Sequence, residues 1–480
     1  MARTTTVLLV GGSGHWAGRE NHAPALLDMQ NSGWPVRTAV ICDPRDPEKR
    51  AQDEGMAPLR ELLVRDAPQW LNPDGLSRTE LESVLDGAHA AHRFSLVIIA
   101  CDPVHHRDYI LWAISRGISV LCDKPLLVAE GAAHDPAAAE SINTSYAAIE
   151  RALTRARATG PCHLAMPLRR RANDVYRSVA ADIAEVQSTY GQGITSMQLI
   201  KNGGLFRYPE EYLFGDAHGY RSGVGALSFS SYHYIDLLAW YLELAPGEAT
   251  AVRVTNPYVR RVGDFLRTRQ AAVLADLIGA GDTGRSVALP PQVLAAEADF
   301  VFNLELLGED GRKAGLVTYS CHSNTYSHRS VGPQEFDRAN RQPFREKGRM
   351  SQFTLDINQG SLQHIGIFKN DVVGEDYRIR VQRRRTPVVA HEPYAEEVFH
   401  NAHAGSSVTP QDVLQAMVRL VSGVSTPAEV ADRIAFFEGQ RLSHHLFGTF
   451  YELIAAGSVA GSAVGSANGG AAERFVELTT

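Results

Sequence analysis

The sequence has few cysteines, and none of them is spaced for metal binding. The five cysteines are Cys42, Cys101, Cys122, Cys162 and Cys321. They form no CxxC pair and no Cys/His cluster with the spacing of zinc ligands. An odd number of isolated cysteines is typical of free thiols in a reducing compartment. We therefore expect no bound metal and a cytoplasmic location.

Long hydrophobic runs and an excess of positive charge are also missing. No stretch approaches the roughly 18 apolar residues that cross a bilayer, and the apolar run ending at Val10 is too short for a signal peptide. Acidic residues number 54 and basic residues 47, for a net charge of -7. We therefore expect neither a membrane nor a nucleic acid as a partner. The sequence also lacks a G-x-S-x-G elbow, which argues against a serine hydrolase.

The chain can bury substantial cores, because 44% of its 480 residues are hydrophobic. Its first third alternates short apolar runs with helix-like patterns, as in an α/β doubly wound parallel sheet. Strands are expected at 6–10, 36–42, 94–100, 118–122 and 162–167. Helices are expected at 23–30, 58–64, 78–85, 106–116 and 146–158, with a surface insertion at 130–139.

The remainder has longer strand-like runs at 297–307, 316–322, 352–357 and 363–369, which predict a mostly antiparallel open sheet. Helices are expected at 232–244, 410–423 and 427–446. Residues 455–472 are almost wholly Ala, Gly, Ser and Val, a composition typical of a flexible tail. The predicted organisation is a parallel-sheet domain at 1–168, a second α/β domain at 169–454 and a flexible tail at 455–480.

A glycine-rich turn follows the first expected strand. Its residues Gly12, Ser13, Gly14, His15, Trp16 and Ala17 fit the G-x-G-x-x-G/A fingerprint. Glycines there let the backbone approach a pyrophosphate, and a helix N-terminus supplies free N–H groups. The first five are therefore candidate cofactor-binding residues, and 1–168 is expected to be a Rossmann dinucleotide-binding domain; a tight turn without a ligand is the alternative. Because residues 18–21 are polar, the first helix is expected to start late or the loop to be wider than usual.

The second expected strand ends at Asp43, where a carboxylate would accept hydrogen bonds from the ribose hydroxyls of a dinucleotide. A carboxylate favours NAD, because it repels the 2′-phosphate of NADP. Arg45 lies two residues further on and could instead pair with that phosphate. We therefore expect NAD as the cofactor, with NADP as the alternative.

Two pairs of motifs carry a resemblance to a known family. The third strand leads into Cys101, Pro103 and His106, and the fourth ends in Asp123, Lys124 and Pro125. Further on, a glycine turn at 223–227 precedes His233 and Asp236. This order resembles the Gfo/Idh/MocA oxidoreductases, named after glucose-fructose oxidoreductase, inositol dehydrogenase and rhizopine catabolism. Their strand usually ends in Glu-Lys-Pro, so Asp123 departs from the pattern.

The resemblance covers about residues 6–245. It implies a Rossmann domain, a substrate domain whose open sheet often forms oligomers, and a sugar, sugar derivative or cyclitol as substrate. It also implies that residues of the two strand-end motifs, Cys101, Pro103, His106, Asp123, Lys124 and Pro125, border the cofactor. We expect a homodimer or homotetramer.

Oxidation of an alcohol needs a base for the hydroxyl proton. Lys124 is the first candidate, because a partly buried ammonium beside a cationic nicotinamide has a lowered proton affinity; a surface lysine is the alternative. His233 is the second candidate, against a histidine that only serves the core. Asp236 shares its helical face and is either a substrate ligand or a structural anchor.

One departure affects the proton relay. Dehydrogenases of the resembled family commonly carry an aspartate four residues before the histidine, and this chain has Phe229. Tyr220, Tyr232 or Asp216 are the candidates to replace it. The basic run 169–171 follows the last expected Rossmann strand, so Arg170 is a candidate ligand for an anionic substrate group, against a solvated surface run.

The expected function is an NAD(P)-dependent dehydrogenase acting on CH–OH groups. One alternative is a net non-redox epimerase or glycosidase that reduces and reoxidises NAD in each turnover. Another is a cofactor-sensing regulatory protein of the same fold, which Phe229 favours and the presence of Lys124 and His233 disfavours.

Overall fold

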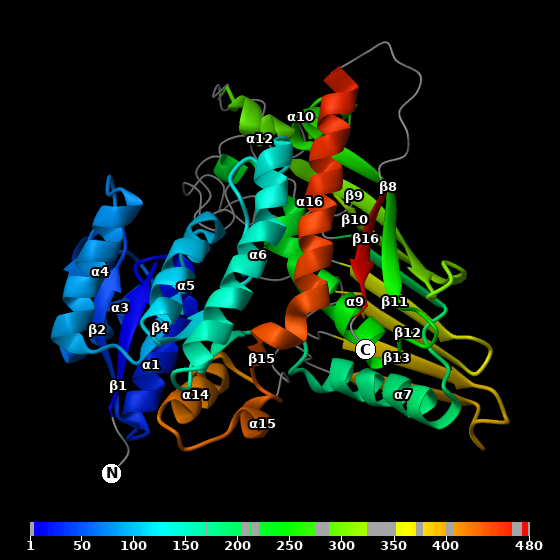
Figure 1. The fold of residues 1–480 in the computed structure, drawn as a ribbon, viewed down its shortest axis with the longest axis horizontal. Coiled ribbons are helices and arrows are strands. Elements are labelled where there is room, and N and C mark those ends of the chain that lie inside the picture. Colours follow the sequence, from blue (N-terminus) through cyan, green and yellow to red (C-terminus); the bar gives the residue numbers. More distant parts are fainter. Residues whose placement is uncertain are drawn as a thin grey trace. The chain divides into compact units, whose positions relative to one another are not determined.

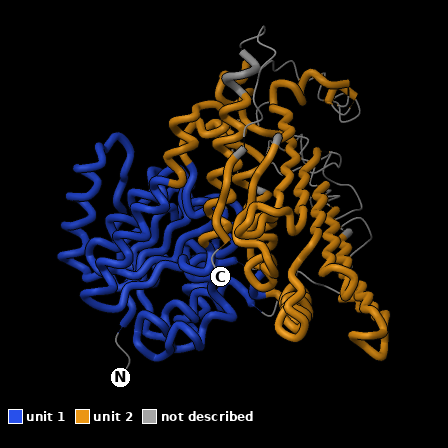
Figure 2. Tube along the Cα trace, turned by 45° about the vertical axis from the view of Figure 1, so that its right-hand side comes forward, with its two compact units in different colours: residues 1–128, 144–172, 407–440 blue, residues 129–143, 173–406, 441–480 orange. Residues whose placement is uncertain are grey.

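The computed structural model describes residues 4–168, 170–202, 212, 220–269, 271–273, 288–323, 352–370, 378–399, 408–462 and 473–478. The chain forms two compact units, shown in blue and orange in Figure 2. Unit 1 comprises residues 1–128, 144–172 and 407–440. Unit 2 comprises residues 129–143, 173–406 and 441–480.

Unit 1 is built on a sheet with the strand order β15-β6-β5-β4-β1-β2-β3 (Figure 1). Every neighbouring pair is parallel except β15 with β6. The strands are β1 (Thr5–Val10), β2 (Val36–Cys42), β3 (Gln69–Leu71), β4 (Leu96–Ile99), β5 (Ser119–Cys122), β6 (Leu164–Met166) and β15 (Ala435–Phe436). β4, β5 and β6 are buried along their whole length, as expected for a parallel sheet covered on both faces. The predicted doubly wound sheet is thus confirmed.

Helices and helical turns connect these strands. They are η1 (His15–Glu20), α1 (His22–Asn31), α2 (Pro47–Arg50), α3 (Ala57–Asp66), α4 (Arg78–His92), η2 (Pro103–His105), α5 (His106–Ser115), α6 (Pro136–Arg157), α14 (Pro410–Val421), α15 (Pro427–Val430) and η6 (Phe437–Gln440). α4 begins with a reciprocal capping box between Ser77 and Glu80. α6 starts at Pro136, so the predicted insertion at 130–139 is wrong for its last four residues.

The predicted domain limits are wrong at the C-terminal side of the chain, because residues 407–440 return to unit 1. α14 packs on α1, and its Met417 belongs to the same buried cluster as Leu26. β15 adds an antiparallel edge strand to β6. The predicted helix at 427–446 is also wrong for residues 427–440, where α15, β15 and η6 lie, and α16 begins only at Arg441. These contacts join segments more than 240 residues apart, which local patterns do not reveal.

Unit 2 is built on a sheet with the order β14-β13-β12-β11-β7-β10-β9-β8-β16. Its strands are β7 (Ser196–Asn202), β8 (Ala251–Arg261), β9 (Glu297–Leu307), β10 (Lys313–His322), β11 (Gln352–Gln359), β12 (Gln363–Asn370), β13 (Arg378–Arg385), β14 (Tyr394–Phe399) and β16 (Glu473–Glu477). Among the strand pairs of the described residues, β7 with β10 is the parallel one, so the predicted mostly antiparallel sheet is confirmed.

The helical segments of unit 2 are α7 (Asp174–Tyr190), η3 (Tyr220–Ser222), η4 (Leu227–Ser231), α9 (Tyr232–Leu244), α10 (Val262–Leu266), α12 (Pro291–Ala295) and α16 (Arg441–Ser462). The predicted flexible tail is wrong for two segments: α16 continues to Ser462, and β16 pairs with β8. Alanine favours helix continuation, and β16 buries Val476 at the edge of the sheet.

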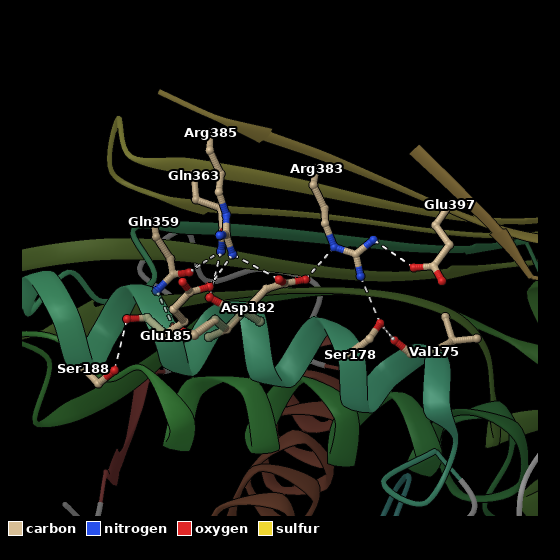
Figure 3. Close-up of polar contacts among 11 residues, drawn as sticks. Val175, Ser178, Asp182, Glu185, Ser188, Gln359, Gln363, Arg383, Arg385 and Glu397 are labelled. Atoms are coloured by element: carbon tan, nitrogen blue, oxygen red, sulfur yellow. Dashed lines mark hydrogen bonds and ion pairs between the residues drawn. The ribbon is translucent and has the colours of Figure 1, made fainter. Parts of the chain in front are cut away.

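A polar network holds α7 on the sheet (Figure 3). Arg385 and Arg383 of β13 both bind the carboxylate of Asp182, and Arg385 also reaches Glu185. The amide of Gln359 donates to the carbonyl of Ile183 at 3.1 Å. These contacts fix one helix against three strands and satisfy the polar groups between them.

Candidate active site

The glycine turn after β1 is tighter than the sequence fingerprint indicates. Gly11 has a φ of +77°, and a Cβ on it would lie 2.5 Å from the backbone nitrogen of Cys101. Its own N–H donates to the carbonyl of Cys42 at 2.8 Å. Only glycine fits this position between β2 and β4. Gly11 was not among the predicted site residues, although the doubled glycine at 11–12 was a signal for it.

The segment after the turn confirms the predicted late helix start. Gly14 is followed by the π-helical turn η1, and α1 begins only at His22. A Cβ on Gly12 would lie 2.8 Å from Leu9. Trp16 is 48% exposed, whereas the side chain of His15 lies outside the described residues. The candidate residues 12–14 thus line the turn itself.

Asp43 ties this turn to the end of β2. Its buried carboxylate accepts the backbone N–H of Ser13 at 3.0 Å through Oδ2. Oδ1 accepts from Arg45, at 2.9 Å from the backbone N–H and 3.2 Å from Nε. Trp70 of β3 donates its indole N–H to the Asp43 carbonyl at 2.8 Å. The two residues predicted to choose between NAD and NADP are therefore an ion pair.

This turn fits a dinucleotide pyrophosphate. The hydroxyl of Ser13 is buried and has no hydrogen-bond partner among the described residues, so it can donate to a phosphate oxygen. The small residues Gly12 and Gly14 allow close backbone approach. Ser13, the glycines and the Asp43–Arg45 pair are the residues of unit 1 that would hold NAD.

His106 joins the loops that follow β4 and β5. It is fully buried, and its Nε2 lies 3.1 Å from the carbonyl of Cys101. Its Nδ1 lies 3.1 Å from the carbonyl of Pro125 and 3.2 Å from that of Leu126. Burial lowers the pKa of the ring below its ordinary value, which favours the neutral form. A neutral ring donates from one nitrogen only, and Nδ1 also lies 3.2 Å from the Cys122 thiol. His106 therefore packs between the loops that follow β4 and β5, and Pro103 starts the helical turn before it.

Asp123 and Lys124 follow β5 directly. The carboxylate of Asp123 lies 3.3 Å from Nε2 of His22 at the start of α1. Burial alone would raise the pKa of this carboxyl, but His22, His106 and Lys124 together hold it below its ordinary value. Lys124 is half-buried. His22 was not predicted, because its contact spans 101 residues.

In unit 2, the glycine turn before α9 closes on a buried glutamate. Glu297 of β9 accepts the N–H groups of Gly225 at 2.8 Å and Leu227 at 3.0 Å, and the hydroxyl of Tyr451 at 2.9 Å. Burial raises the pKa of Glu297. A Cβ on Gly225 would lie 2.1 Å from the Glu297 carbonyl, so this position needs glycine. The sequence signal for Glu297 was a carboxylate at the start of an apolar strand.

The side chains predicted on α9 differ in their surroundings. Asp236 is buried and accepts from Ser443 of α16 at 3.0 Å, as a structural anchor does. Tyr232 is buried, with its hydroxyl 3.2 Å from Nε2 of His444. His233 is half-buried on the first turn of the helix. Tyr232 and Asp236 thus connect α9 to α16.

The position of the expected aspartate is filled by aromatic packing. Phe229 is buried and stacks on Tyr220 at 5.7 Å between ring centroids. Tyr220 also packs on Tyr212. Asp216 lies outside the described residues. Arg170 lies in unit 1 and is half-buried.

The described ranges contain neither a metal-ligand cluster nor a membrane-spanning helix. Within them, no group of three or more His, Cys, Asp and Glu side chains could hold a metal ion. None of the helices in those ranges is long and apolar enough to span a bilayer.

Comparisons with known proteins agree with this geometry. Residues 5–148 match the profile of the Gfo/Idh/MocA family, described as an oxidoreductase family with an NAD-binding Rossmann fold. A search of curated protein sequences finds no match.

Solved structures share the fold over nearly the whole chain. An oxidoreductase from Agrobacterium radiobacter, in complex with NAD+, L-tartaric acid and magnesium, is 14% identical, with a TM-score of 0.52 and 99% of each chain covered. The WlbA dehydrogenase from Bordetella pertussis, in complex with NADH and UDP-GlcNAcA, is 13% identical, with a TM-score of 0.51, covering 100% of this chain and 99% of that one. A super-repressor mutant of Gal80p from Saccharomyces cerevisiae is 12% identical, with a TM-score of 0.52, covering 96% of this chain and 97% of that one.

The glycine turn, the loops beside His106 and the match over residues 5–148 agree: this part of the chain is similar to the NAD-binding Rossmann domain of the Gfo/Idh/MocA oxidoreductases.

Proposed function

We propose that this protein transfers a hydride between NAD and a hydroxyl carbon of a sugar, sugar derivative or cyclitol. The observation that carries the proposal is the place of Lys124 in unit 1. The glycine turn follows β1 and Lys124 follows β5, and β4 lies between these parallel strands. Their carboxyl ends therefore share one edge of the sheet, about 10 Å apart at two strand spacings. Ligands of such sheets bind outside this edge, where the strand order reverses.

NAD, when bound, supplies the hydride acceptor. Lys124 takes the hydroxyl proton at Nζ, and the His106 contacts hold its backbone in place. In unit 2, His233 on the first turn of α9 is the second candidate to hydrogen-bond the substrate. Arg170 is the candidate ligand for an anionic substituent. Each side chain acts on binding, orientation or proton transfer.

Other proteins of this fold support the substrate class. The Bordetella pertussis enzyme binds a nucleotide sugar with NADH, and the Agrobacterium radiobacter enzyme binds a hydroxy acid with NAD+. A cofactor-sensing regulatory role is the second candidate, because Phe229 places an aromatic stack where a carboxylate is expected and because Gal80p has this fold. The half-buried Lys124 at the strand end favours the enzyme.

The test is a spectrophotometric assay of NAD reduction with a panel of sugars, sugar derivatives and cyclitols. The purified wild-type protein should reduce NAD with one substrate class. Lys124→Ala should lower kcat by about a hundredfold or more, the usual effect of losing a general base. NADP in place of NAD tests the Asp43–Arg45 pair, with NAD expected to be preferred.

Lys49→Ala is the matched control, because Lys49 is an exposed lysine of the same unit, with its side chain 84% exposed. It should leave kcat unchanged. If Lys124→Ala and Lys49→Ala have equal activity on a reactive substrate, Lys124 is not the base. If NAD binds to the wild-type protein but no member of the panel reacts, the regulatory role gains support.

A further inference from the structure

A histidine from α1 reaches the carboxylate that precedes Lys124. Nε2 of His22 lies 3.3 Å from both Oδ1 and Oδ2 of Asp123. The side chains are 5% and 14% exposed, so water has little access to the pair. Because a carboxylate only accepts hydrogen bonds, Nε2 carries a proton and donates it to Asp123. A buried carboxylate needs such a donor.

Three other ionisable groups among the described residues act on the charge of Asp123. His106 faces it from the start of α5, the Cys122 thiol from the end of β5, and Lys124 from the same segment. His106 is directed to backbone carbonyls, and its burial favours the neutral form. The thiol of Cys122 is kept protonated, because burial raises its pKa. Among the described residues, His22 therefore binds this carboxylate directly, and Lys124 is the other basic group whose charge acts on it.

Two local features bring His22 and Asp123 within reach of each other. The π-helical turn η1 delays the start of α1, so that His22 is its first residue. The residue that follows β5 is an aspartate, whose carboxylate extends one methylene less than a glutamate would. The imidazole of His22 spans the remaining distance.

We infer that His22 is a positioning residue for Lys124 that acts through Asp123. By donating to the carboxylate, His22 keeps Asp123 from holding Lys124 as an ion-paired ammonium. This inference rests on the proposed role of Lys124 as the base. Without His22, Asp123 has Lys124 as its main cationic partner, and Lys124 binds its proton more tightly.

The test measures the proton affinity of Lys124 without any substrate. The full-length protein is labelled with acetic anhydride over a pH series, and the acetylation of Lys124 is followed by mass spectrometry. Only the neutral amine reacts. In His22→Leu, the labelling midpoint of Lys124 should move up by about one pH unit, a tenfold smaller neutral fraction at a given pH.

His22→Gln is the conservative control, because its amide nitrogen can donate at nearly the place of Nε2. Its midpoint should stay at the wild-type value. His22→Asn is too short to span the distance and repeats the test with a polar side chain, should the leucine variant not fold. Adding His22→Leu to Asp123→Asn should produce no further change, since the charge that His22 controls is then gone.

The pH profile of turnover separates this inference from the proposed function. If the labelling midpoint moves but the wild-type protein turns over no substrate, the proposed function fails and the His22–Asp123 coupling stands. If the protein is an active dehydrogenase and the folded His22→Leu and His22→Asn variants both label like wild type, the inference is overturned. Unfolding midpoints measured for each variant establish which ones are folded.

Discussion

Gly11 follows β1, between the ends of β2 and β4, where the backbone leaves no room for a side chain. Gly11→Ala combines a left-handed backbone with a Cβ only 2.5 Å from the nitrogen of Cys101. We expect the variant to lose about 3 kcal/mol or more of unfolding free energy, measured in urea, because backbone strain and a steric clash add. NAD binding should weaken as well.

Gly33→Ala isolates the backbone part of this effect. Gly33 has a φ of +80°, and a Cβ on it would meet no atom within 4 Å. Gly33→Ala should lose only about 1 kcal/mol of unfolding free energy. Equal losses in the two variants would mean that the neighbourhood of Gly11 relaxes freely.

Residues were predictable where the chemistry is local in sequence. The fingerprint at Gly12 and Gly14 and the strand-end Asp43 follow from spacing alone, and the structure brings them together. His22 and Glu297 escaped prediction, because their partners lie 101 and 70 or more residues away. A histidine or glutamate near an element end has many ordinary roles, and only the fold selects one.

At the scale of elements, the turn before α9 depends on the charge state of Glu297. Burial raises the pKa of Glu297, so the folded protein keeps this proton over a pH range in which the unfolded chain has lost it. The stability from Glu297 is complete below the ordinary pKa of 4.5 and falls as the pH rises through the raised value. Glu297→Gln keeps an acceptor and has no proton to lose.

The free energy of unfolding of Glu297→Gln relative to wild type should therefore rise by about 1 kcal/mol or more as the pH increases above the ordinary pKa of 4.5. Urea titrations at several pH values measure it. Glu305→Gln on the same strand is the control, because hydrogen bonds from Lys313 and Arg253 lower the pKa of Glu305. The free energy of unfolding of Glu305→Gln relative to wild type should stay constant in this range. A constant value for Glu297→Gln would refute the prediction.

The return of α14 to unit 1 gives a second prediction at this scale. Met417 is fully buried in the cluster that includes Leu26 of α1. Met417→Ala should cost about 3 kcal/mol of unfolding free energy, because it leaves a cavity. Gln415→Ala, on the same helix and outside the buried cluster, should cost less than about 0.5 kcal/mol. Similar values for both variants would contradict the packing of α14 on α1.

Most elements were predictable, since hydrophobic periodicity marks them. The expected strands at 36–42 and 297–307 and the expected helix at 232–244 coincide with β2, β9 and α9. The segments after residue 455 were not predictable, because an Ala-rich sequence is compatible with a helix as well as with a flexible tail. β16 is stabilised by pairing with β8, more than 200 residues earlier.

At the scale of the whole molecule, the chain does not divide at one boundary. It passes between the two units after residues 128, 143, 172, 406 and 440 (Figure 2). A prediction that assigns each domain one continuous stretch of sequence gives the correct sheet types. It misses the repeated passage of the chain between the two units. The Rossmann sheet and the antiparallel sheet were each predictable, because each has its own local pattern.

The central claim is that this protein moves a hydride between a nicotinamide and a hydroxyl carbon, with Lys124 handling the proton. Its most direct test is isotope transfer from deuterium-labelled NADH to a panel of oxidised sugars and cyclitols, followed by mass spectrometry. We predict deuterium on a carbon of one substrate class, with the rate reduced about a hundredfold in Lys124→Ala and unchanged in Lys49→Ala. Bound NADH that passes no deuterium to any member of the panel would contradict the account.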